Sequence, residues 1–283
     1  MAGIPTYSEG MLRRLITMSV ALGLPALRCA AAQAPSRDVV LATTTSVYDT
    51  GLLDSIAPLF ERATGYRLRV VAVGSGQALR MGERGDADVI VVHSPAAEEA
   101  FMAAGHGISR RVVATNYFTI VGPAADPARV RDAASAGDAL RRIAETGAVF
   151  VSRGDSSGTH ARELALWRAA GGRPAWPSYI ETGQGQSATL LIANERRGYA
   201  LTDRSTLGAL QGHMDLVPLL GRDPELLNVY RVIELNPAER PHLNQAGGHA
   251  FAEFLLSETA QDLLERFGRS RFGEALFTPA RGP

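Results

Sequence analysis

The chain has no lysine, so all 29 of its basic residues are arginine. This absence excludes a lysine-based phosphate loop and a Schiff-base lysine. The single cysteine, Cys29, lies close to the amino terminus, and a mature chain that begins after it has no disulfide or thiol chemistry. Any anion site in this chain therefore has to be built without lysine.

The first 34 residues have the pattern of a secretory signal peptide. An arginine pair at 13–14 precedes an apolar run at 15–24, and small residues follow at 30–34. The apolar run is too short for a stable transmembrane helix. We expect residues 1–34 to be removed on export, by either the general secretory or the twin-arginine route.

The charge that remains after export is nearly balanced. Without residues 1–32 the chain carries 26 arginines and 28 acidic residues, a net charge of −2. Anion binding must then come from local geometry and not from the field of the whole protein. The same balance argues against a nucleic-acid partner.

Short runs rich in β-branched residues alternate with runs that have one-face helical spacing. This alternation predicts βαβ units with mostly parallel sheets, in which ligands gather beyond the carboxyl ends of the strands. Pro58 interrupts one helical pattern, so we expect a kink or a late helix start there. The predicted strands are 39–42, 68–73, 88–92, 148–151 and 199–202, and the predicted helices are 52–63, 77–84, 96–105, 139–145, 161–170, 187–194, 245–256 and 260–267.

Two longer strand-like runs predict crossings between two lobes. One is 111–121, broken around Asn116, and the other is 227–235. We therefore expect a discontinuous first lobe of residues 35–116 plus 232–283. The second lobe would be the inserted segment 117–231.

Three polar loops follow predicted strands and could face one cleft: Thr43–Ser46, Gly74–Gly76 and Arg153–Thr159. Hydroxyls, glycines and the amino terminus of a helix are suited to binding an anion. Arg153 adds a rigid guanidinium fork that matches a tetrahedral oxyanion. Asp155 is expected to orient Arg153 or to cap the helix that follows.

The three loops together resemble those of the tungstate-binding proteins of bacterial ABC importers. The likeness extends from about Asp38 to Phe277, and the Thr-Thr-Thr-Ser loop is its most specific part, since related phosphate binders share the arginine loop. It implies the type II periplasmic-binding-protein fold, two α/β lobes that close on a ligand without chemistry and without a cofactor or metal. It also implies a periplasmic monomer that delivers tungstate to a membrane permease, with molybdate, sulfate or phosphate as alternative ligands.

The resemblance also implies which residues touch the ligand. Phosphate binders of this type place an aspartate after the third strand, whereas His93 and Ser94 stand there in this chain. We therefore expect no carboxylate acceptor in the cleft, which favours a fully ionised anion over one that retains a proton. The implied ligand-binding residues are Thr44, Thr45, Ser46, Ser75, Arg153, Ser157, Gly158 and Thr159.

Other features of the sequence could indicate a nucleotide, metal or catalytic site. Gly183–Ala188 fits the dinucleotide fingerprint but lacks the βαβ context, so a loop lining the cleft is favoured. The histidines show no metal-ligand spacing, and His160 could either touch the ligand or pack in its helix. An enzyme that uses Arg153 as a phosphate anchor would need a base beside the hydroxyls, and the sequence shows none.

Overall fold

The structure, a computed structural model, describes residues 36–210, 212–221 and 223–281. All of these belong to one compact unit, residues 35–283. The predicted signal peptide, residues 1–34, lies outside the described residues. Among the described helices, none combines the length and the apolar character needed to cross a membrane.

A large sheet forms the centre of the fold. Its main path has the spatial order β10 (Thr278–Pro279), β4 (Gly107–Gly122), β9 (Leu227–Leu235), β3 (Val89–Val92), β1 (Asp38–Thr44) and β2 (Arg67–Val73). β1 runs parallel to both of its neighbours, whereas β9 is antiparallel to β3 and to β4. The carboxyl ends of β1, β2 and β3 therefore lie at one edge of the sheet, as the sequence predicted. The sheet as a whole is mixed and not mostly parallel as predicted, because the two crossing strands β4 and β9 pair antiparallel with each other.

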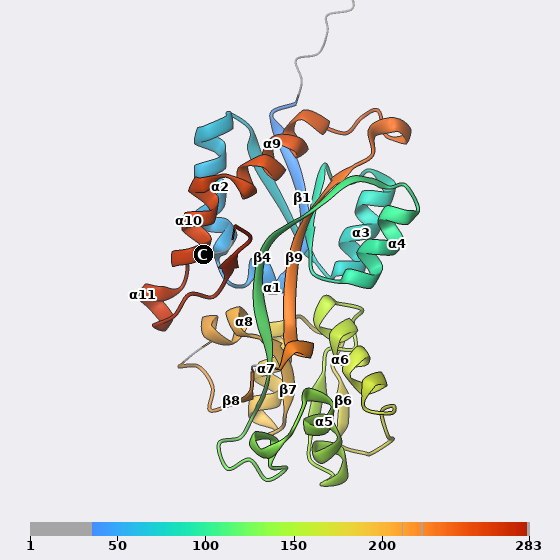
Figure 1. The fold of residues 1–283 in the computed structure, drawn as a ribbon, viewed down its shortest axis with the longest axis vertical. Coiled ribbons are helices and arrows are strands. Elements are labelled where there is room, and N and C mark those ends of the chain that lie inside the picture. Colours follow the sequence, from blue (N-terminus) through green and yellow to red (C-terminus); the bar gives the residue numbers. More distant parts are fainter. Residues whose placement is uncertain (1–35, 211, 222, 282–283) are drawn as a thin grey trace, which may run out of the picture. The chain divides into compact units, whose positions relative to one another are not determined.

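Helices cover both faces of this sheet in the first lobe (Figure 1). Neighbouring residues of β1 face opposite sides, so Leu41 packs in one apolar core with Phe60 and Phe251, and Ala42 in another with Phe101. Burial on both faces explains why the central residues of β1 and all of β3 are apolar. The helices are α1 (Thr45–Tyr48), α2 (Leu52–Thr64), α3 (Ser75–Arg84), α4 (Pro95–Ala103), α9 (Gln245–Leu256), α10 (Glu258–Arg266) and α11 (Arg269–Phe272).

The second lobe is built on the far half of β4 and on a small separate sheet. Its strands are β5 (Phe150–Ser152), β6 (Tyr179–Glu181), β7 (Ala200–Asp203) and β8 (Val217–Leu220), and its helices are α5 (Ala136–Glu145), α6 (Gly158–Ala169), α7 (Gln186–Glu195) and α8 (Arg204–Ala209). β7 and β8 pair antiparallel with β4, and β5 pairs parallel with β6. A parallel bridge between Phe150 and Tyr199 joins the small sheet to this group.

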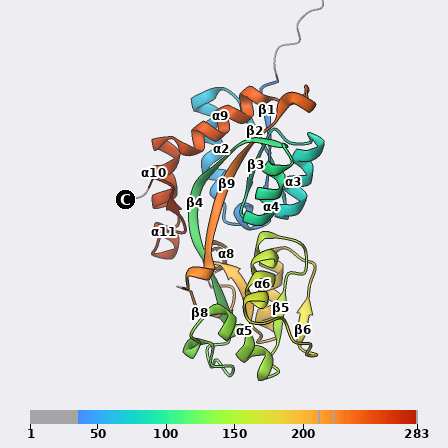
Figure 2. The same ribbon diagram turned by 45° about the vertical axis from the view of Figure 1, so that its right-hand side comes forward.

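The two crossing strands lie side by side in both views (Figures 1 and 2). β9 has the bounds that the sequence predicted. β4 is one continuous strand, so the predicted break around Asn116 is wrong. What changes there is the pairing partner: Tyr117 is the last residue of β4 opposite β9, and Phe118 pairs with Asp203 of β7.

Several element boundaries differ from the sequence prediction in ways that matter for the polar loops. α2 begins at Leu52 and runs through Pro58 without interruption, so a late start is wrong. α3 begins at Ser75 and α6 at Gly158, earlier than predicted. The ends of both loops, Ser75–Gly76 and Gly158–Thr159, thus lie in the first turns of helices, where backbone N–H groups have no partner within the helix.

Candidate anion-binding site

The first candidate loop forms where β1 ends. Thr44 caps α1, and its Oγ1 accepts a hydrogen bond from the amide of Val47 at 3.4 Å. The hydroxyls of Thr44 and Ser46 lie 3.1 Å apart, and both side chains are buried. Capping residues with short hydroxyl side chains explain why the strand turns directly into a helix.

His93 lies against this loop and was missed as a site residue by the sequence reasoning, which searched the same position only for a carboxylate. Its Nε2 is 3.1 Å from the hydroxyl oxygen of Ser46, and the ring is buried. Burial, reinforced by the positive charge of Arg153, lowers the pKa of His93 from 6.5 to about 4. His93 is therefore neutral at physiological pH. The available signal was a polar residue directly after a buried strand of the sheet.

The Arg153–Thr159 loop begins with Arg153, which is only 3% exposed. Its Nε donates to the carbonyl of Gln184 at 3.2 Å, and its Nη2 donates to Thr45 Oγ1 at 3.4 Å and to the carboxylate of Asp155. The expectation that Asp155 orients Arg153 is confirmed. The expectation that no carboxylate lies in the cleft needs correction, because Asp155 stands beside the guanidinium.

The Asp155 carboxylate is already engaged on both sides. One oxygen accepts from Arg153, and the other accepts from the amide of Ser157 at 3.1 Å. It therefore holds the loop in shape and leaves Arg153 partly neutralised. Each of its oxygens keeps a further lone pair, but the carboxylate is held in place as the partner of Arg153 and of the Ser157 amide.

The base of the Arg153 loop is fixed from behind by a buried glutamate on α6. The hydroxyl of Ser152 donates to Glu163 Oε2 at 2.7 Å, and the hydroxyl of Tyr179 donates to Glu163 Oε1 at 2.6 Å. Burial raises the pKa of Glu163. These contacts join β5, β6 and α6, so the guanidinium projects from a rigid base.

The amino terminus of α6 follows the arginine loop. Ser157 is its cap, and its Oγ accepts from the amide of His160 at 3.1 Å. Gly158 and Thr159 are the first two residues of this 12-residue helix. Their amides lie at the positive end of the helix dipole, which favours an anion. The ring of His160 accepts at Nδ1 from the amide of Ser156, which ties it to the loop.

Two buried hydroxyls point to a missing partner. Ser75 Oγ and Thr159 Oγ1 are fully shielded, and neither has a hydrogen-bond partner among the residues that the structure describes. A buried hydroxyl without a partner costs about 1–3 kcal/mol, so native proteins seldom leave one in place. An anion among these groups would accept from both.

The loops meet each other across the two lobes. A Cβ built on Gly158 would lie 2.6 Å from His93 Cε1, and one on Gly74 would lie 3.6 Å from the carbonyl of Asp155. Gly76 is close to the carbonyl of Ser156. Together with the contact between Arg153 and Thr45, these approaches bring all three predicted loops into one region.

The Gly-rich loop before α7 also contributes. The carbonyl of Gln184 accepts from Arg153, in agreement with the predicted loop lining the cleft. Gln186, which the sequence reasoning did not single out, is buried: its Nε2 donates to the carbonyl of Leu201, and its Oε1 has no partner among the described residues.

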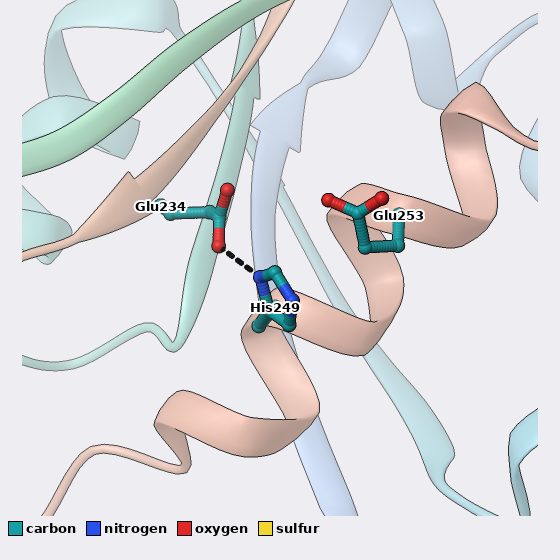
Figure 3. Close-up of side chains that lie close together, drawn as sticks. All are labelled: Glu234, His249 and Glu253. Carbon is teal, nitrogen blue, oxygen red and sulfur yellow. Dashed lines mark hydrogen bonds and ion pairs between the residues drawn. The ribbon is translucent and has the colours of Figure 1, made fainter.

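A separate cluster of Glu234, His249 and Glu253 has metal-ligand atoms within 4.8 Å of one another (Figure 3). Arg111 donates to both glutamates, at 2.8 Å and 2.6 Å, and so supplies the positive charge. Glu234 pairs with Val89, at the opposite end of β3 from the polar loops. We interpret this cluster as an ion-pair network apart from the candidate site.

The lowered pKa of His93 predicts how stability depends on pH. Because the unfolded chain binds the proton near pH 6.5 and the folded chain only near pH 4, stability is complete above pH 6.5 and is lost as the pH falls toward 4. The expected loss is about 3 kcal/mol. Urea unfolding between pH 4 and 8 checks this, with His93→Gln as the matched variant. A difference between the two proteins that does not change with pH would contradict the prediction.

The chain is similar to a known protein family and to proteins of known name. A family model described as a PBP superfamily domain matches residues 30–259. The chain is 43% identical over 276 residues to the tungstate-binding protein TupA of Peptoclostridium acidaminophilum, covering 94% of this chain and 96% of that protein.

Solved structures agree with this similarity. A structure described as the tungstate ABC transporter from Geobacter sulfurreducens is 41% identical, with a TM-score of 0.74, and the match covers 80% of this chain and 97% of that one. The tungstate-binding protein TupA from Desulfovibrio alaskensis G20 is 42% identical, with a TM-score of 0.71, covering 86% of this chain and 98% of that one.

Proposed function

The chain belongs to the PBP superfamily and, within it, to the family of the TupA tungstate-binding proteins, and we propose that it captures tungstate for an ABC importer. This membership confirms the two-lobed α/β fold that the sequence predicted. We infer that the protein is an exported, periplasmic monomer without enzymatic activity. Its partner would be the membrane permease of the importer.

The observation that carries the proposal is a set of buried donors without protein acceptors. Ser75 Oγ and Thr159 Oγ1 are unpaired among the described residues, and they lie in loops that also supply Arg153 and the amino terminus of α6. A fully ionised oxyanion has only acceptor atoms, so it would accept from all of these groups at once. The proposed ligand contacts are Thr44, Thr45, Ser46, Ser75, Arg153, Ser157, Gly158 and Thr159.

The strength of such a site follows from the number of contacts. A hydrogen bond to a charged group contributes about 1.5–3 kcal/mol when its geometry is good. About six of them offset the loss of hydration of the anion and leave binding near −12 kcal/mol, which corresponds to a nanomolar dissociation constant.

We propose that binding closes the two lobes. The first lobe would be residues 35–116 plus 232–283, and the second residues 117–231. β4 and β9 are the segments that pass between them, and the pairing partner of β4 changes after Tyr117. Small backbone changes in these two strands would then act as the hinge.

One observation favours the alternative that the protein is an enzyme: Ser46 Oγ lies 3.1 Å from His93 Nε2. A serine nucleophile would need this histidine as its base. The pKa of His93 near 4 makes it a weak base, and Nδ1 has no carboxylate partner among the described residues. Binding without turnover is therefore the better-supported function, and an assay with phosphate and carboxylate esters is expected to show none.

Calorimetric titration with tungstate, molybdate, sulfate and phosphate tests the proposal. The position directly after β3 carries the neutral His93 and not a carboxylate, and Asp155 is already bonded to Arg153 and to the Ser157 amide, so the proton of hydrogen phosphate has no dedicated acceptor. We expect the fully ionised anions to bind at least tenfold more tightly than phosphate at neutral pH, a difference of about 1.4 kcal/mol. Phosphate binding that equals or exceeds tungstate binding would overturn the assignment.

A further inference from the structure

We propose that His93 is a positioning residue for the anion: its neutral imidazole directs the Ser46 hydroxyl toward the ligand and forms the surface on which α6 seats when the lobes close. The inference rests on the proposed function and names a residue that the three predicted loops do not contain.

His93 lies between the two sides of the site. Its Nε2 contacts Ser46 Oγ of the first lobe, and its Cε1 and Nδ1 face Gly158, the first residue of α6 in the second lobe. The ring centroid is 4.9 Å from that of Tyr230 on β9 and 6.1 Å from that of Phe118 on β4. The imidazole thus lies beside both crossing strands, the Thr43–Ser46 loop and the start of α6.

The direction of the hydrogen bonds follows from counting protons. Thr44 Oγ1 already accepts from the amide of Val47, and it lies 3.1 Å from Ser46 Oγ. Each hydroxyl has one proton to donate, and an anion can only accept. If Ser46 donated to His93, its proton would not be available to the ligand. The Nε2–H tautomer of His93 removes this conflict, because the imidazole then donates to Ser46.

The charges around His93 favour the neutral form. Arg153 and Arg162 of the second lobe both act on the ring, and the positive end of α6 faces it through Gly158. Asn228 of β9 opposes this effect. Asp155 is bonded to Arg153 and to the amide of Ser157. A protonated imidazole would therefore be repelled by the groups that bind the anion.

Gly158 packs directly against His93, with no room for a side chain between them. A Cβ on this residue would lie 2.6 Å from His93 Cε1, 2.7 Å from Nδ1 and 3.0 Å from the backbone oxygen of His93. Such a close approach is possible only for glycine. His93 therefore sets how far α6 and the Arg153 loop can move toward the hydroxyls of the first lobe.

A double-mutant cycle tests the inference, with tungstate affinity measured by calorimetry. The variants are His93→Phe, Ser46→Ala and the two combined. Phenylalanine keeps a planar ring beneath α6 and removes only the N–H donor. We therefore expect His93→Phe to weaken binding at least tenfold in the unmodified background and less than twofold in the Ser46→Ala background, since the lost donor acts through Ser46. His93→Gln, which keeps an N–H donor, is expected to recover part of the loss. His213→Phe, at an exposed histidine, serves as the control.

A second measurement uses the unmodified protein, so it does not depend on whether the variants fold. The ring nitrogen shifts of 15N-labelled protein in complex with tungstate are expected to show His93 protonated at Nε2 and unprotonated at Nδ1.

The outcomes separate the two proposals. If the unmodified protein binds no tungstate, the proposed function and this inference both fail. If it binds tungstate but the fold losses of affinity in His93→Phe and Ser46→Ala multiply in the double variant, only the inference is overturned. A proton found on Nδ1 of His93 has the same consequence.

Discussion

Replacing Arg153 by alanine is expected to weaken tungstate binding by about 2–5 kcal/mol, or roughly 30-fold to several thousand-fold. The guanidinium is buried and supplies the positive charge among the proposed ligand contacts. Its removal also leaves the carboxylate of Asp155 without its charged partner, so an uncompensated negative charge then lies near the anion. The loss should therefore lie toward the upper end of this range.

Matched variants distinguish this role from a general effect of charge. Arg153→Lys should recover only part of the affinity, because an ammonium group cannot reproduce the planar fork. Thr45→Ala removes one neutral donor and should cost about 1–2 kcal/mol. Arg141→Ala, which removes an exposed arginine on α5, should leave binding unchanged. If Arg153→Ala binds tungstate within twofold of the unmodified protein, Arg153 does not contact the ligand.

Gly158→Ala is expected to weaken tungstate binding by about 3 kcal/mol, roughly 100-fold, because it blocks closure. The new Cβ would lie 2.6 Å from the buried ring of His93 and 3.0 Å from a backbone oxygen, which cannot easily yield. Alanine is also a better helix former than glycine. The free energy of unfolding of the open protein should therefore not fall, and the effect should appear in binding.

Small-angle scattering measures closure of the lobes, whose loss is the expected cause of the weaker binding. The unmodified protein should show a smaller radius of gyration when tungstate is added, whereas Gly158→Ala should not. Gly76→Ala is the control, since its Cβ would lie 3.5 Å from the nearest atoms of Ser156 and Arg80. Normal closure and affinity in Gly158→Ala would show that α6 does not seat on His93.

The loops of the candidate site were largely predictable because their chemistry is local. A hydroxyl or a glycine directly after a buried strand is visible in the sequence, and Thr44 and Ser157 do cap the helices that follow them. Asp155 could be assigned to Arg153 because only Gly154 separates them in the sequence. The exact helix starts were not predictable, since serine and glycine occur both in turns and at the starts of helices. Ser75 and Gly158 could therefore belong to either.

The parts that depend on tertiary contacts could not be read in advance. The place of His93 after a buried strand was visible, but its contacts with Ser46 and Gly158 appear only once β3 lies beside β1 and α6 approaches from the other lobe. Asn116 looked like a strand break, because an asparagine is unfavourable in an isolated strand. In the fold it is buried, and its side chain donates to Tyr230 and Ser205 while accepting from Asn228. These partners come from distant segments.

The anomalous scattering of tungsten in crystals grown with tungstate tests the central claim most directly. The account predicts a single strong peak between the lobes, with its oxygens within hydrogen-bond distance of Arg153, Ser75 Oγ and Thr159 Oγ1. A peak elsewhere on the protein, or none at saturating tungstate, would contradict the proposed site.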